Sequence, residues 1–286
     1  MRTATNQALL GVVVLVVLLS SSAFAMYFMS NTACPNEIRH TLLNLQGNEM
    51  HQQFSKCRLV YLDVGSNIGV QVRKLYEPTR YPNAEVLPIF DQYFGRHRHQ
   101  EKHLCAIGFE LNPTHTGRLH ALETHYRDHC NYSVRFFTET AATTQNSAIP
   151  FWSDGDVSNL EWGSSTNTPF WMRKDRRKSI VQSIDLAEFI LRNITPFAST
   201  IVMKIDIEGG EYQLLPRLVA TGALCDVDFV FLEQHSADWA SSQKDLYQHA
   251  SALAHSGMSA TGCKVRISLL DDESFLHDAD GTLNTC

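Results

Sequence analysis

The chain has 286 residues, of which 44% are hydrophobic and 19% are charged, so it can bury the core of one large α/β domain. Its formal net charge of −6 argues against a general nucleic-acid binder, and we expect no nucleic-acid partner.

The first 30 residues predict a membrane-targeting element. Ala8–Met29 carries no charged residue and follows Arg2. A run of this length can span a bilayer as a transmembrane signal anchor, whereas the small residues around Ala23–Ala25 suit cleavage of a signal peptide. We therefore expect the rest of the chain to be lumenal, in the Golgi or endoplasmic reticulum and attached to the membrane, or to be secreted if residues 1–30 are removed.

Two further features agree with that compartment. Sequons at Asn131 and Asn193 predict a glycoprotein. The seven cysteines include no C-x-x-C pair, which disfavours zinc and leaves disulfides or buried thiols. Four of them come just before predicted strands, at the edge of the sheet away from the expected ligand: Cys57, Cys105, Cys130 and Cys225. Cys263 and Cys286 are placed to tie down the C-terminal tail by pairing with each other.

Residues 31–56 are polar with a modest helical period, which predicts a stem or cap helix, and the folded domain is expected over residues 57–286. Strand-length apolar runs then alternate with helical stretches: "RLVYLDV", "AIGFEL", "SVRFFTE", "TIVMKIDIE" and "DVDFVFLEQ". This alternation predicts a mostly parallel sheet with helices on both faces. The segment Glu77–Leu104 lies between the first two strands as an insertion placed to cover a site.

The second half of the chain adds further elements. "SIDLAEFILRN" predicts a helix capped by Ser183, and another helix is expected over about Lys244–His255, ending at Gly257. The segments "KVRISLL" and "SFLHDA" predict two closing strands.

The stretch "LVYLDVGSNIGV" carries the first candidate site residues. A buried strand stops at Asp63 and is followed by a turn with Gly65, Ser66, Asn67 and Gly69. In an open parallel sheet, ligands bind beyond the carboxyl ends of the strands. The turn is therefore expected to face a ligand, with glycines that let the backbone approach it.

The next two strand ends carry more acids. "AIGFELNP" ends in Glu110, and an acid at this position can accept hydrogen bonds from both hydroxyls of a ribose. In "IVMKIDIEGGEYQLL", the side chains of Lys204, Asp206 and Glu208 are expected on one face of a strand. "FVFLEQHS" brings Glu233 and His235 to the same edge. A purely structural network of charges is the alternative reading of this group.

In this order, "LDVGSNIGV", "GFELNP", "WGSS" and "KIDIEGGEYQLL" resemble the FkbM-type branch of the class I S-adenosylmethionine-dependent methyltransferases, over roughly Cys57 to His235. The resemblance implies a Rossmann-like sheet of seven strands with a final antiparallel strand. It also implies S-adenosyl-L-methionine as the cofactor and a hydroxyl oxygen as the usual acceptor. By position, Asp63, Gly65, Asn67 and Gly69 match the loop that holds the methionine part.

The same resemblance extends to other residues. Glu110 matches the ribose ligand, and "TETAA", with Thr140 and Ala141, falls where the adenine contact is expected. Ser66 and Asp206 complete the expected cofactor-binding set.

The expected function is methyl transfer to a hydroxyl oxygen of a glycan or small molecule in the secretory pathway. Since a sulfonium methyl is already electrophilic, the enzyme has mainly to align the acceptor and remove its proton. Asp206, Glu208 and His235 are the candidate bases, and Lys204 is a candidate for orienting or stabilising an anion. Asp206, Glu208 and Glu233 offer hard oxygen ligands, so use of a metal stays open, but nothing in their spacing requires one and no metal site is assigned.

Two other functions fit the sequence less well. One is a non-catalytic lumenal interaction protein that retains a nucleoside-binding fold. The other is a nicotinamide-dependent oxidoreductase, which the missing G-x-G-x-x-G fingerprint disfavours.

Overall fold

A computed structural model describes residues 52–153, 177–233 and 265–270, with the single residues Ser164, Thr166, His235, Gln248, Ala252, Cys263, Asp272 and Leu283. Residues 53–286 belong to one compact unit. The predicted anchor, most of the stem and the strand at "SFLHDA" lie outside the described residues, as does most of the helix expected at Lys244–His255. No helix in the described ranges is long and apolar enough to cross a membrane.

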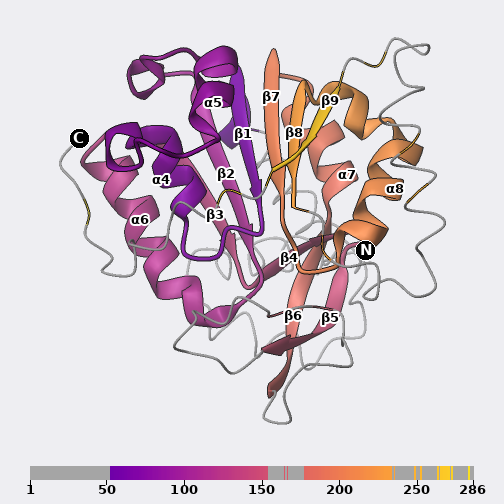
Figure 1. Ribbon diagram of the computed structural model, residues 1–286. Helices are drawn as coiled ribbons and strands as arrows, with labels where there is room; N and C mark the ends of the chain where they lie inside the picture. Colours follow the sequence, from indigo (N-terminus) through magenta and orange to yellow (C-terminus); the bar gives the residue numbers. More distant parts are fainter. Residues whose placement is uncertain are drawn as a thin grey trace, which may run out of the picture. The chain divides into compact units, whose positions relative to one another are not determined.

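The main sheet has six strands in the described part of the chain, in the order β3-β2-β1-β7-β8-β9 (Figure 1). Their bounds are β1 Leu59–Val64, β2 Leu104–Glu110, β3 Ser133–Thr138, β7 Thr200–Ile205, β8 Phe229–Leu232 and β9 Arg266–Leu269. Every adjacent pair is parallel. The expectation of seven strands with a final antiparallel one is therefore wrong for the described residues. Residues 233–265 separate β8 from β9, which is enough chain for the crossover that a parallel pair needs.

Helices cover both faces of this sheet, as expected (Figure 1). On one side lie α4 (Val70–Tyr76), α5 (Leu87–Phe94) and α6 (Thr116–Asp128), and on the other lie α7 (Leu186–Phe189) and α8 (Glu211–Thr221). The predicted cap of α7 is wrong. Ser183 lies within a strand, and the carboxylate of Asp185 caps the helix by accepting from the Glu188 amide at 3.2 Å.

The insertion Glu77–Leu104 is part of the core and not a cover for the site. It contains η1 (Pro78–Arg80), α5 and η2 (Arg98–Gln100). Phe90 of α5 is fully buried and packs edge-on against Tyr61 of β1. The buried guanidinium of Arg98 donates to the carbonyl of Leu75 at 2.8 Å and so fastens the insertion to α4.

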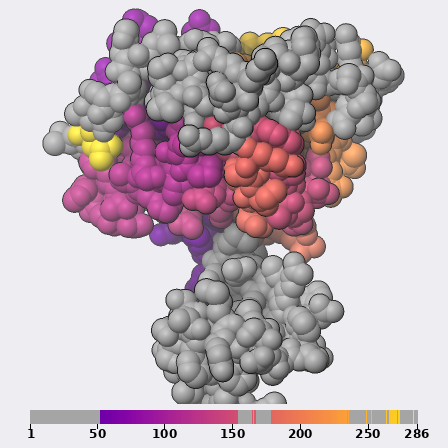
Figure 2. Space-filling view, turned by 90° about the horizontal axis from the view of Figure 1, so that it is seen from below, coloured from indigo at the N-terminus to yellow at the C-terminus, as the bar shows by residue number. Residues whose placement is uncertain are grey.

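A second, smaller sheet was not expected from the sequence. It has the order β4-β6-β5, with β4 at Thr140–Thr143, β5 at Ser147–Ser153 and β6 at Arg177–Asp185. Strand β5 pairs with β6 in antiparallel fashion. In the view from below (Figure 2), a magenta surface accordingly adjoins a salmon one, the colours of the residues before 154 and after 176.

Two disulfides are described. Cys57 pairs with Cys105 at the amino ends of β1 and β2, and Cys225 pairs with Cys263. The expected Cys263–Cys286 pair is therefore wrong. Of the two sequons, Asn131 is exposed, whereas Asn193 is 8% exposed and its amide donates to the carbonyl of Phe189. Burial of Asn193 makes it a poor glycan acceptor.

Candidate functional site

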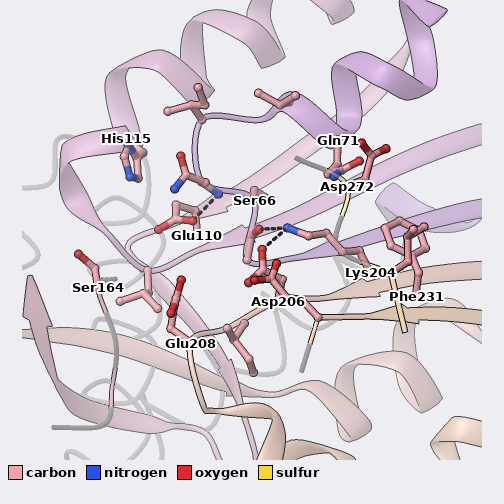
Figure 3. Close-up of a pocket in the computed structure, with 18 residues that line it drawn as sticks. Ser66, Gln71, Glu110, His115, Ser164, Lys204, Asp206, Glu208, Phe231 and Asp272 are labelled. Atoms are coloured by element: carbon pink, nitrogen blue, oxygen red, sulfur yellow. Dashed lines mark hydrogen bonds and ion pairs between the residues drawn. The ribbon is translucent and has the colours of Figure 1, made fainter. Parts of the chain in front are cut away.

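A pocket opens where the carboxyl ends of β1, β2, β7 and β8 meet (Figure 3). The empty space of this pocket, including the part open to solvent, is about 840 Å³. The lining includes many of the predicted site residues: Gly65, Ser66, Asn67, Glu110, Lys204, Asp206, Glu208 and Glu233. Asp63, Gly69, Thr140, Ala141 and His235 do not line it.

The turn after β1 is tight for a reason that the sequence did not reveal. Gly65 has φ +88°, and a Cβ placed on it would lie 1.7 Å from the backbone oxygen of Asp206. Gly69 has φ +83°, and its Cβ would lie 2.7 Å from a side-chain carbon of Leu122 in α6. Both glycines therefore allow close packing within the protein, and their expected role in letting the backbone approach a ligand stays a prediction.

Asp63 lies beneath the pocket and has no exposed surface. Its Oδ1 accepts a hydrogen bond from the Tyr61 hydroxyl at 3.2 Å, whereas its Oδ2 has no hydrogen-bond partner. Burial raises the pKa of Asp63, and the nearby ammonium of Lys204 partly offsets this effect. Asp63 therefore influences the pocket through the charge of Lys204, which lines it.

Glu110 is held at the pocket by two backbone amides. Its Oε2 accepts from the amide of Asn67 at 2.6 Å, and its Oε1 accepts from the amide of Asn112 at 2.7 Å. Burial raises the pKa of Glu110 to about 7, although both hydrogen bonds favour the charged form. Each carboxylate oxygen has a second lone pair, so the fixed group can accept two more hydrogen bonds.

Two other polar atoms at the pocket are buried without a hydrogen-bond partner. They are Oδ1 of Asn67 and Oε1 of Gln71. Asn67 has φ +47°, which holds its backbone amide toward Glu110. Buried polar atoms are costly unless they are hydrogen-bonded, so these two atoms point to a polar ligand. Gln71 was missed from the sequence because it lies inside an ordinary helical pattern.

Lys204 links the two central strands (Figure 3). Its ammonium donates to the carbonyl of Gly65 at 2.9 Å and pairs with Oδ2 of Asp206 at 2.8 Å. Burial alone would lower the pKa of Lys204, but the carboxylates of Asp206 and Asp63 raise it well above its usual value. Lys204 is therefore charged and fixes the position of Asp206.

Strand β7 ends at Ile205, so the expected alternation does not continue to Glu208. Glu208 has φ +52° and reaches its place through the turn that precedes α8. Burial raises its pKa, and His235 opposes this effect.

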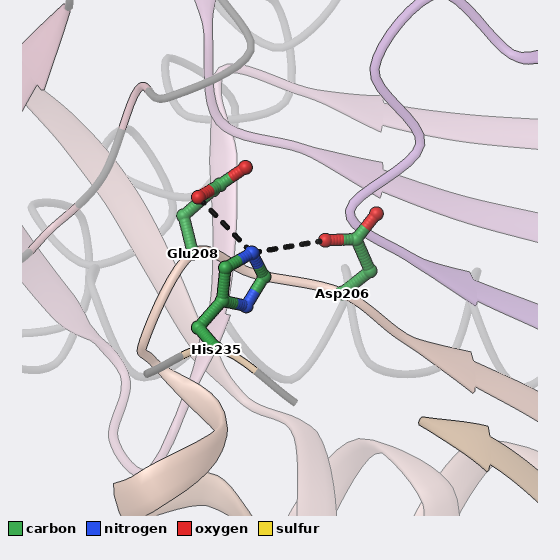
Figure 4. A group of neighbouring side chains, drawn as sticks. All are labelled: Asp206, Glu208 and His235. Atoms are coloured by element: carbon green, nitrogen blue, oxygen red, sulfur yellow. Dashed lines mark ion pairs between the residues drawn. The ribbon is translucent and has the colours of Figure 1, made fainter. Parts of the chain in front are cut away.

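His235 lies among carboxylates (Figure 4). Its Nδ1 contacts Oε1 of Glu211 at 2.9 Å, and its Nε2 contacts Oε2 of Glu208 at 3.1 Å, Oε1 of Glu233 at 3.5 Å and Oδ1 of Asp206 at 3.9 Å. Burial alone would lower the pKa of His235, but its hydrogen bonds to Glu208 and Glu211 raise it to about 11. In this arrangement the ring is a charged donor, which is the opposite of what a base requires.

A smaller cavity adjoins the main pocket, because Leu111 and Ile207 line both. Ala141 lines this second cavity, whereas Thr140 lines neither one and its hydroxyl donates to the carbonyl of Thr138. Of the two residues predicted to contact adenine, only Ala141 therefore lines a cavity.

The far wall of the main pocket contains Asp272, which the sequence reasoning missed. Its carboxylate pairs with the fully buried ammonium of Lys74 in α4 at 3.1 Å and accepts from the amide of Val86 at 3.2 Å. Burial lowers the pKa of Lys74, and Asp272 partly offsets this effect. No local pattern signals this contact, since the two residues are 198 positions apart.

Comparison with known proteins identifies a family for the chain. No curated protein and no solved structure matches the chain. The model of the methyltransferase FkbM domain matches residues 63–257, which is more than half of the chain and contains nearly all of the residues described above. The chain therefore belongs to the FkbM methyltransferase domain family.

Proposed function

We propose that the chain binds S-adenosyl-L-methionine in the pocket between β1, β2 and β7, and methylates a hydroxyl oxygen of a glycan or small molecule in the secretory pathway. Membership of the FkbM family supports methyl transfer. The observation that carries the assignment of the cofactor is the Glu110 carboxylate, which two backbone amides orient at the rim of the pocket.

The residues present fit this cofactor. Glu110 has free lone pairs for the two ribose hydroxyls, and the unpartnered Oδ1 of Asn67 and Oε1 of Gln71 can accept from the amino group of the methionine part. The smaller cavity beside Leu111, Ala141 and Ile207 is lined largely by apolar atoms of a kind that suits an adenine ring. When bound, the cofactor supplies an electrophilic methyl group.

The chain's own contribution to the reaction is to place the acceptor and accept its proton. Glu208 is the better candidate for the base, because it lines the pocket and burial raises its pKa. Asp206 is the second candidate, with its orientation fixed by Lys204. His235, which carries a proton, is better suited to positioning Glu208 than to removing a proton.

The compartment and the acceptor class remain part of the proposal. The Cys57–Cys105 and Cys225–Cys263 disulfides support an oxidising environment, such as the lumen of the secretory pathway. The apolar segment Ala8–Met29 supports delivery to that compartment and attachment to a membrane.

The test is calorimetric titration of the purified full chain with S-adenosyl-L-methionine and with its demethylated product. We expect saturable binding of both, which Glu110→Ala weakens and Glu101→Ala, the same change at an exposed carboxylate, leaves unchanged. A folded wild type that binds neither compound would refute the enzyme assignment and favour a non-catalytic interaction protein.

A further inference from the structure

Carboxylates and one imidazole from two strand ends lie close together beside the pocket. Asp206 and Glu208 follow β7, and Glu233 and His235 follow β8. Ligand atoms of Asp206, Glu208 and His235 all lie within 4.8 Å of one another (Figure 4). Oε1 of Glu233 is 3.5 Å from Nε2 of His235, so this carboxylate lies next to the group of three.

We propose that Asp206, Glu208, Glu233 and His235 bind one divalent metal ion of the Mn²⁺ or Zn²⁺ class. A donor set of three carboxylates and one imidazole suits these ions, whereas Ca²⁺ and Mg²⁺ prefer oxygen ligands alone. This proposal departs from the sequence analysis, in which the spacing of these residues gave no reason to expect a metal.

The first argument is the orientation of the imidazole. Glu211 has no exposed surface, and its carboxylate holds Nδ1 of His235 at 2.9 Å, while the backbone amide of Gly209 donates to its other oxygen at 3.0 Å. Metal-binding histidines nearly always donate their second ring N–H to such an acceptor. Nε2 is thereby aimed at Glu208 and Glu233, and a bound metal ion would take the place of the proton on Nε2.

The second argument is charge. Four carboxylates surround His235, those of Asp206, Glu208, Glu211 and Glu233. The ammonium of Lys204 pairs with Oδ2 of Asp206, which leaves Oδ1 facing the histidine. Counting only these four carboxylates, the protonated ring and the Lys204 ammonium, negative charge is in excess, and the side chains are 0 to 28% exposed. A divalent ion would remove this excess at a place that water screens poorly.

The third argument is position. Asp206, Glu208 and Glu233 also line the main pocket, so an ion held by them would face the space in which an acceptor has to lie. A metal ion can bind a hydroxyl oxygen and lower its pKa. This role in catalysis rests on the proposed methyl transfer, and with the ion bound Glu208 and His235 would serve as ligands in place of the roles given to them above; the binding of the ion itself does not rest on that transfer.

The experiment is calorimetric titration of the metal-free full chain with Mn²⁺, Zn²⁺ and Mg²⁺, without any methyl donor. Visible absorption after addition of Co²⁺ gives a second readout that detects inner-sphere ligands. Glu208→Gln and Glu233→Gln remove one charged ligand each and keep the side-chain shape. Glu101→Gln is the matched control, because it makes the same change at an exposed carboxylate.

We expect one saturable site for Mn²⁺ or Zn²⁺ that Glu208→Gln and Glu233→Gln each weaken by about 10- to 100-fold, with weaker binding of Mg²⁺ and no effect of Glu101→Gln. Circular dichroism establishes that each variant is folded. Absence of saturable binding, or equal binding by all variants, would overturn the proposal. Titration with S-adenosyl-L-methionine is a separate measurement, so failure of the metal site and failure of the proposed function are distinguishable.

Discussion

Replacing Gly65 with alanine tests whether the pocket depends on contact between two turns of the protein. The backbone of Gly65 has φ +88°, and the added Cβ would lie 1.7 Å from the backbone oxygen of Asp206. Because real Cβ atoms do not approach an oxygen so closely, the β1–α4 turn and the β7–α8 turn have to separate by more than about 1 Å.

The cost has two parts. An L-residue with positive φ loses about 1–2 kcal/mol, and forced overpacking of a rigid site loses about 1–3 kcal/mol more. Gly65→Ala should therefore lower the free energy of unfolding by about 2–5 kcal/mol, a large share of the 5–15 kcal/mol that is typical of a domain. Gly222→Ala is the matched control, since Gly222 has φ +79° but no atom within 4 Å of its Cβ. Gly222→Ala should therefore lose only about 1–2 kcal/mol, the part that comes from the positive φ.

The assay is denaturant unfolding of both variants, followed by circular dichroism, together with titration of S-adenosyl-L-methionine. The difference between the two variants measures the contact with Asp206 and should be about 1–3 kcal/mol. Gly65→Ala should also weaken cofactor binding, because Asp206 and Lys204 move with the turn. If Gly65→Ala were no less stable than Gly222→Ala, the close approach of the two turns would be refuted.

Three other outcomes are expected. The pKa of Glu110 is raised from 4.5 to about 7, so between these pH values the folded chain binds more protons than the unfolded chain. Relative to Glu110→Gln, the wild type should therefore lose up to about 3 kcal/mol of unfolding free energy as the pH rises through this window. Parallel curves of stability against pH for the two proteins would contradict this expectation. Replacing both Cys57 and Cys105 with serine opens a loop of 48 residues and should cost about 4 kcal/mol in denaturant unfolding, whereas no change would argue against the bond. Lys204→Met removes the ammonium that pairs with Asp206 and should lower the free energy of unfolding by about 3–5 kcal/mol in the same assay. An unchanged free energy of unfolding would show that the fold does not need this ion pair.

The strands and the main acidic residues of the site were predictable, because the patterns that mark them lie within short stretches of sequence. Apolar runs of strand length mark β1, β2 and β7, and the carboxyl ends of parallel strands meet at one edge. Glu110 and Asp206 come directly after such runs, so their convergence at the pocket follows from topology.

What the sequence could not reveal depends on contacts between distant segments. The space around Gly65 is limited by the backbone oxygen of Asp206, and no sequence pattern around Gly65 reveals this contact. The small β4-β6-β5 sheet depends on pairing across a long connection. His235 reads as a base when taken alone, and only the convergence of its carboxylate neighbours shows that it is a charged donor.

The ion pair between Lys74 and Asp272 has a consequence for the order of events during synthesis. Translation proceeds at about 5–20 residues per second, so a separation of 198 residues corresponds to roughly 10–40 s between the two. During that interval the Lys74 ammonium lacks the carboxylate of Asp272, which is one of its counter-charges, so its burial is less favourable. Helix α4 therefore docks firmly only when the segment after β9 has emerged from the ribosome. We therefore expect the pocket to be completed late in folding, because Asp272 both pairs with Lys74 and lines the pocket.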